Sequence, residues 1–103
     1  MIMNEVKLYS IRPKLTPEID SIKNNNYNAR NPVHRAAITE ANKRALQPLY
    51  NFLGTLPSIH PDYKMLPKTF SISALLTTEQ VALIQKRPDI EEIAEDFTDD
   101  DFE

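Results

Sequence analysis

Two segments alternate apolar and polar side chains with the period of a half-buried β-strand. These are residues 5–12 and residues 69–75, where Phe70 begins a run of apolar side chains on one face opposite small polar ones. Shorter β-rich stretches at residues 63–66 and 90–94 predict two more strands. The chain therefore contains four predicted strands.

After Asn31 the apolar residues recur with a helical period. We predict that Asn31 caps this helix and that Pro32 occupies its first position. The predicted apolar face comprises Val33, Ala37, Ile38, Ala41, Ala45 and Leu46. We expect this helix to kink or restart at Pro48, because proline lacks an amide proton and clashes with the preceding turn. The apolar surface then continues to Gly54, which predicts a C-cap.

A second helix is predicted to begin at Thr77, because Gln80 three residues later completes a capping box. Pro88 ends it. Residues 14–32 read instead as a long irregular loop, with at most one helical turn after Thr16.

The predicted order is strand, helix, strand, strand, helix, strand. This order favours an α+β fold of the ferredoxin-like split βαβ type (β-α-β-β-α-β), with a four-stranded antiparallel sheet and two helices on one face. A single domain is expected over residues 1–96, followed by a tail at residues 97–103, because 103 residues suit one core.

Composition narrows the function classes. The chain has no cysteine, which excludes disulfides and thiolate metal sites, and one glycine, which excludes phosphate-cradling loops. We expect no cofactor and no enzymatic activity. The N-terminus lacks the pattern of a secretory leader and no apolar run could span a bilayer, so a cytoplasmic protein without a membrane partner is expected.

Charge divides the chain sharply. Residues 1–87 carry 12 basic and six acidic side chains, whereas residues 88–103 carry nine acidic side chains and no basic one. A solvated acidic tail is the simplest interpretation. Calcium binding at the tail is disfavoured because the EF-hand spacing and its glycine are absent. RNA binding is disfavoured because the basic-glycine-aromatic signature of RNA-binding sheets is missing, so no nucleic acid partner is expected.

His34 and His60 are isolated, and no cysteine or third histidine accompanies them. Ordinary helix and loop positions explain them better than catalysis or metal binding. Tyr50, Phe52 and Phe70 are expected in the core.

Four features of residues 70–96 occur together: the strand end Ala74-Leu75, the helix start Thr77-Thr78-Glu79, the stop Arg87-Pro88-Asp89, and a last strand ending in Glu95-Asp96. In this respect the segment resembles the second half of the subtilisin propeptide-like inhibitors. The resemblance implies an inhibitor, an intramolecular chaperone, or both, of a subtilisin-like serine protease. Such a domain docks its sheet on two protease helices and lays its C-terminal tail into the active cleft.

By the resemblance, Asp96 caps one protease helix, while Ala94 stands where the family has a second acid, so Glu92 or Glu95 becomes the candidate for that role. The implied protease-binding residues are Glu92, Glu95, Asp96, Phe97, Thr98, Asp99, Asp100, Asp101, Phe102 and Glu103. Either Phe102 or Glu103 would fill the first specificity pocket. The free protein is expected to be a monomer.

A second interpretation stays open. The chain also fits a non-enzymatic adaptor or antitoxin-like interaction domain whose acidic tail binds a basic surface on its partner.

Overall fold

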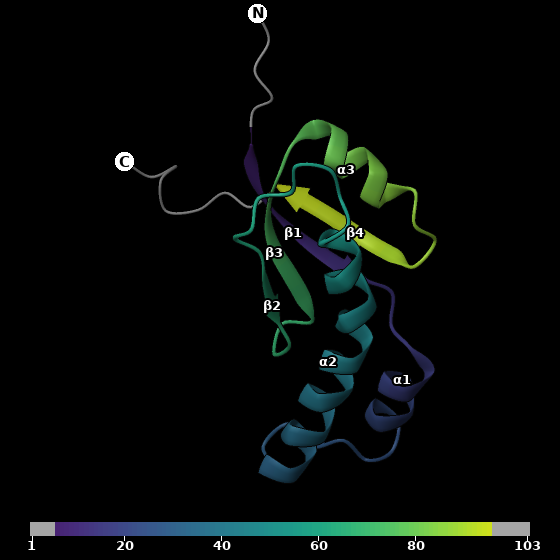
Figure 1. Cartoon of the computed structure of the whole chain (residues 1–103). Coiled ribbons are helices and arrows are strands. Elements are labelled where there is room, and N and C mark those ends of the chain that lie inside the picture. Colours follow the sequence, from purple (N-terminus) through teal and green to yellow (C-terminus); the bar gives the residue numbers. More distant parts are fainter. Residues whose placement is uncertain (1–5, 96–103) are drawn as a thin grey trace, which may run out of the picture.

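The computed structural model describes residues 6–95 and shows an α+β fold with three helices and a four-stranded antiparallel sheet (Figure 1). In chain order the elements are β1 (Lys7–Pro13), α1 (Pro17–Lys23), α2 (Pro32–Leu53), β2 (Lys64–Leu66), β3 (Ser71–Leu76), α3 (Thr78–Gln85) and β4 (Ile90–Glu95). All four predicted strands are present. Within residues 6–95, no helix has the length and apolar character needed to cross a bilayer.

The sheet has the strand order β2-β3-β1-β4. The central strand β1 pairs with β3 through the register Ser10 to Ser73, and with β4 through Ser10 to Ala94. A bulge between Arg12 and Pro13 interrupts the second pairing. The strands β2 and β4 therefore form the two edges.

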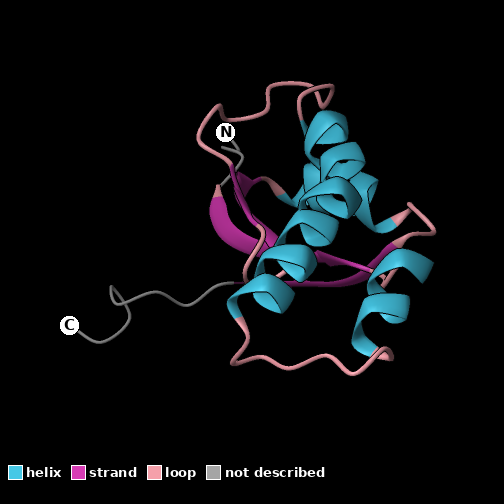
Figure 2. Cartoon of the chain, turned by 90° about the horizontal axis from the view of Figure 1, so that it is seen from below, coloured by secondary structure: helices cyan, strands magenta, loops and turns pink. Residues whose placement is uncertain are grey.

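The helices that touch the sheet cover one of its faces. The helix α2 contacts β1, β2 and β3, and α3 contacts β3 and β4, beside which it lies in Figure 1. The fully buried side chains of the strands point to this side, and Ile11 and Ile72 are the central pair. Figure 2 shows α1 standing beside α2, and α1 contacts α2 but no strand. The molecule consequently has a helical layer and a sheet layer.

The helix α2 runs through Pro48 without the predicted restart. Pro48 is exposed, so its ring faces solvent, while Leu49 and Leu53 after it are buried. Burial of these two leucines holds the helix together across the missing hydrogen bond. The Asn31 cap is confirmed, since its side chain accepts from the amide nitrogens of Val33 and His34.

Two details of the predicted α2 face are wrong. Val33 is 73% exposed because the first turn extends past the sheet, and Ala37 is also exposed. Asn42 is buried instead, and its amide donates to the carbonyl oxygen of Pro67 at 2.8 Å. The buried polar group thus fixes the β2–β3 turn to the helix.

The expectation of two helices and an irregular loop at residues 14–32 is wrong in part, because the turn expected after Thr16 is present but extends into the seven-residue helix α1. Thr16 caps α1 by accepting from the amide of Ile19, whose side chain is fully buried. Glu18 forms an ion pair with Arg44 of α2. One buried side chain and one surface ion pair therefore anchor a helix too short to persist alone.

The capping box at the start of α3 is confirmed. Thr77 and Gln80 exchange hydrogen bonds between side chain and backbone at 2.9 and 3.2 Å. The Gln80 amide also donates to the carbonyl of Pro57 at 2.8 Å. The start of α3 is therefore tied to the turn that follows α2.

Candidate protein-binding face

The sheet face opposite the helices is built from small side chains. One cross-strand row reads Lys64, Ser73, Ser10 and Ala94 from β2 to β4. Successive side chains of a strand point to opposite faces of the sheet. The side chains of this row therefore point away from the helices, whereas those of the neighbouring residues Ile72 and Ile11 point toward them. The three small members of the row, Ser73, Ser10 and Ala94, would let another backbone approach closely.

Two neighbouring rows frame the small residues. On one side Leu8 lies across from Leu75, and both are half-buried. On the other side Arg12 lies across from Glu92. We call the surface formed by Leu8, Ser10, Arg12, Ser73, Leu75, Glu92 and Ala94 the open face. It offers apolar contact beside a charged edge.

The two described acids of the expected protease-binding set lie on opposite sides of β4. Glu92 is on the open face, and its carboxylate lies 3.7 Å from the Arg12 guanidinium. Glu95 pairs with Tyr9 in register, and its carboxylate lies 3.8 Å from the Lys7 ammonium. Glu92 and Glu95 are the two candidates for the second helix-capping acid, the position at which Ala94 stands. Glu92 lies on the same face as Ala94, and Glu95 does not.

The other expected site residues, Asp96, Phe97, Thr98, Asp99, Asp100, Asp101, Phe102 and Glu103, lie outside the described residues. The strand that precedes them, β4, is an edge strand.

A cluster at the end of α3 positions the beginning of β4. The Arg87 guanidinium lies 4.7 Å from the centre of the Phe52 ring and donates two hydrogen bonds to Asp89, at 2.8 and 3.0 Å. These hydrogen bonds lower the pKa of the Asp89 carboxyl below its ordinary value, although partial burial opposes the effect. The backbone carbonyl of Asp89 accepts from the amide of Lys14 at 2.8 Å. The cluster therefore joins α2, α3, β1 and β4.

The histidines occupy structural positions. His34 accepts from the amide of Asn28 at 2.9 Å and stacks on Tyr27, and His60 accepts from the amide of Asp62 at 3.1 Å. In the described part of the chain, no three His, Asp or Glu side chains group as metal ligands would. Tyr50 and Phe52 are half-buried against the core, and Phe70 is buried.

Sequence reasoning identified Glu92, one acid of the open face, but did not recognise Ser10, Ser73 and Ala94 as one row. The signal was present in the small polar side of residues 69–75, yet only the pairing register joins that side to β1 and β4.

Comparison with known proteins adds no relative: no family model, curated protein or solved structure matches the chain.

Proposed function

We propose that this protein inhibits a subtilisin-like serine protease, assists its folding, or does both, by docking the open face and presenting the C-terminal tail to the active cleft. The fold proposed with it is the ferredoxin-like split βαβ arrangement. The antiparallel strand order β2-β3-β1-β4 supports that topology, with α1 as an addition before the first crossover helix.

The open face carries the proposal. Short side chains let the helices of a partner approach a sheet closely, and the row Ser10, Ser73 and Ala94 provides such a strip. Leu8 and Leu75 beside it supply apolar area that a partner would remove from water. Because α2 and α3 lie on the other face, they leave room for a docked partner.

The acids beside this strip give the partner an orientation. Glu92 lies next to Ala94 on the open face, so it is the better candidate for the amide groups at a helix N-terminus. Its present partner Arg12 is exposed, so exchanging this ion pair for a docked helix costs little. Asp96 and the tail would add the second cap and the substrate-like segment.

The test measures inhibition of a panel of subtilisins by the full chain. Ala94→Arg places a long cation on the open face and should weaken inhibition at least about tenfold. Ala82→Arg is the matched control, since Ala82 is exposed on α3, and it should change inhibition less than about twofold. Phe102→Ala should also weaken inhibition, because it removes the proposed pocket side chain.

Absence of inhibition of every protease by the full chain at micromolar concentration would contradict the proposal. Equal effects of Ala94→Arg and Ala82→Arg would contradict the docking face. Strongly salt-dependent binding to a basic protein, unaffected by Ala94→Arg, would favour an adaptor whose tail carries the interaction.

A further inference from the structure

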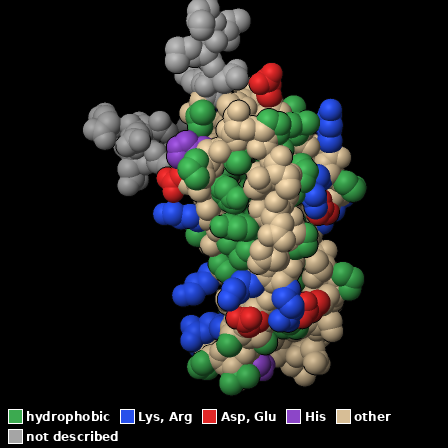
Figure 3. All heavy atoms as spheres, in the orientation of Figure 1, with side chains coloured by type: hydrophobic (Ala, Val, Ile, Leu, Met, Phe, Trp, Pro, Cys, Tyr) green, Lys and Arg blue, Asp and Glu red, His purple; other side chains and the backbone are tan. Residues whose placement is uncertain are grey.

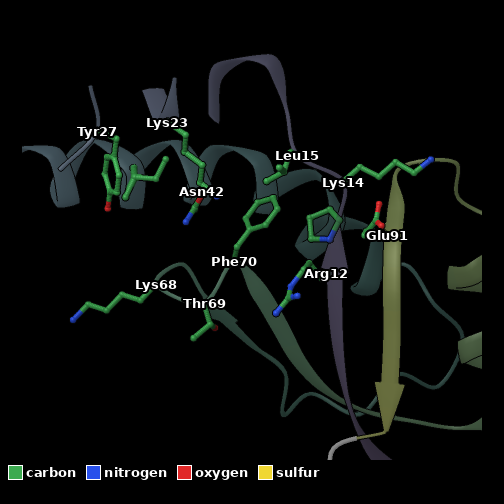
Figure 4. A pocket seen from close by; sticks show the side chains of 12 residues that line it. Arg12, Lys14, Leu15, Lys23, Tyr27, Asn42, Lys68, Thr69, Phe70 and Glu91 are labelled. Carbon is green, nitrogen blue, oxygen red and sulfur yellow. The ribbon is translucent and has the colours of Figure 1, made fainter. Parts of the chain in front are cut away.

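A groove runs between the helices and the end of the sheet. Its first part is a hollow of about 790 Å³ lined by α2, by residues at and after the end of α1, and by the residues at the end of β1. Figure 4 shows its side chains on opposite walls, with Tyr27, Lys23 and Asn42 facing Lys68 and Thr69 across Phe70 and Arg12. A second hollow of about 620 Å³ shares Tyr27, Ile38, Asn42 and Lys68 with the first and adds Arg35. The two form one continuous groove.

The rim of this groove is basic. We call it the basic groove, after Lys23, Arg35 and Lys68; Arg12 also lines it but is paired with Glu92. Lys23, Arg35 and Lys68 are exposed and form no ion pair within residues 6–95. Figure 3 shows Lys and Arg side chains gathered on the lower half of the helical side. The groove therefore presents positive charge that the described residues do not neutralise.

Two acids also line the groove, and neither cancels this charge. Glu91 stands at the end formed by β4, and Glu40 lies 3.7 Å from Lys43. Charge of one sign is thus concentrated between Lys23 and Lys68, where the walls face each other.

The floor is apolar and firmly built. Phe70 and Ile38 are each 9% exposed, and Phe70 has a φ of 54°, which an L-residue rarely adopts. The hydrogen bond from Asn42 to Pro67 holds the turn that imposes this conformation. The Phe70 ring is buried, so of the two aromatic rings that line the groove only that of Tyr27 could stack on a nucleobase. A basic rim over an apolar floor fits instead an acidic peptide that also carries apolar side chains.

We propose that the basic groove binds the acidic C-terminal segment of this same chain, residues 96–103. This segment, which lies outside the described residues, contains five carboxylate side chains, two phenylalanines and no basic residue. Its composition complements a basic rim and an apolar floor.

The distance is within reach. Glu95 pairs with Tyr9, and Arg12 lies three residues further along β1, which is about 10 Å in a strand. Eight extended residues span about 26 Å. The segment is therefore long enough to turn back along the edge of the sheet and reach Arg12, which lines the near end of the groove.

This interaction does not depend on the proposed function. A segment held in the basic groove is unavailable to any other partner, so the groove would set how readily the tail is released. High salt would favour release, because the contact is mainly electrostatic at the rim.

The first experiment follows backbone amide resonances of the full chain, without any protease. Replacing Asp99, Asp100 and Asp101 by asparagine should shift the resonances of Lys23, Lys68 and Thr69 and leave those of α3 unchanged. Raising the salt concentration of the wild-type protein should move the same resonances in the same direction. Asp62→Asn, a change at an exposed acid outside the groove, is the control and should not move them.

The second experiment adds a synthetic peptide of residues 96–103 to the triple-asparagine chain. Lys68→Glu should weaken peptide binding at least about fivefold, whereas Lys86→Glu, an equal charge change at the end of α3, should weaken it less than about twofold. Three results would overturn the proposal: unshifted groove resonances in the triple variant, equal effects of the two lysine changes, or a groove that responds to inorganic phosphate but not to the peptide. Each leaves the protease proposal standing, and a lack of protease inhibition leaves the groove proposal standing.

Discussion

At the scale of single residues, Asp89 links folding to pH. Its pKa is lowered in the folded protein, chiefly by the hydrogen bonds from Arg87. A lowered folded-state pKa means that the carboxylate stabilises the fold above its ordinary pKa of about 4, and that this contribution is lost as pH falls through the lowered value.

Asp89→Asn should therefore lower the free energy of unfolding near neutral pH and have little effect in acid. Because the carboxylate is about half exposed, the expected loss is only about 0.5–1 kcal/mol. Urea denaturation at about pH 7 and about pH 2 measures it. The backbone hydrogen bond from Lys14 remains in the variant, so an equal loss at both pH values would show that the carboxylate charge is not the cause.

Gln80 is a second residue whose single side chain serves two segments. It is 4% exposed, closes the capping box of α3 and donates to Pro57. Gln80→Ala should lower the free energy of unfolding by about 1–3 kcal/mol, because it removes the cap and leaves the Pro57 carbonyl without its donor. Gln85→Ala, at an exposed glutamine on the same helix, should change it by less than about 0.5 kcal/mol. Similar midpoints for the two variants in denaturant would refute this role.

At the scale of elements, α2 carries a defect that burial compensates. Pro48 interrupts the hydrogen-bond ladder on the exposed side of the helix, while Leu49 is buried beside it. Pro48→Ala should raise the free energy of unfolding by about 1–2 kcal/mol. Alanine restores the backbone hydrogen bond that proline cannot donate, and this gain should exceed the stability lost because the unfolded chain becomes less rigid. Thermal denaturation measures the change. A lower midpoint would indicate that the proline geometry is itself required for packing.

The elements also show how far the sequence determines the structure. The strands and the Asn31 and Thr77 caps are local features, and their side-chain patterns predict them. The sequence predicts at most one turn of α1, after Thr16, because the whole helix is stabilised by the burial of Ile19 and by the Glu18–Arg44 pair, both of which depend on α2. The open face and the basic groove require the pairing register and the packing of α1, so composition revealed only their charge.

At the scale of the whole molecule, the two edge strands of the sheet determine whether the free chain remains a monomer or pairs with a second copy. The strand β2 has only three residues, and β4 carries Glu91, Glu92 and Glu95. Short edges and charged edges both resist pairing with another sheet. The wild-type protein is therefore expected to sediment as a monomer of 11.8 kDa.

Replacing the three β4 glutamates by threonine should remove this protection. Threonine favours strands and carries no charge, so the edge would then pair with the edge of a second copy. Sedimentation velocity should show association of this variant that increases with concentration, while a variant with threonine at the exposed helical acids Asp20 and Glu40 should remain monomeric. Because Glu92 and Glu95 also pair with Arg12 and Lys7 of β1, a thermal midpoint must be measured alongside. Association of a variant whose midpoint is unchanged assigns the effect to the edge. A stable variant that stays monomeric at every concentration contradicts the argument that the β4 glutamates prevent edge pairing.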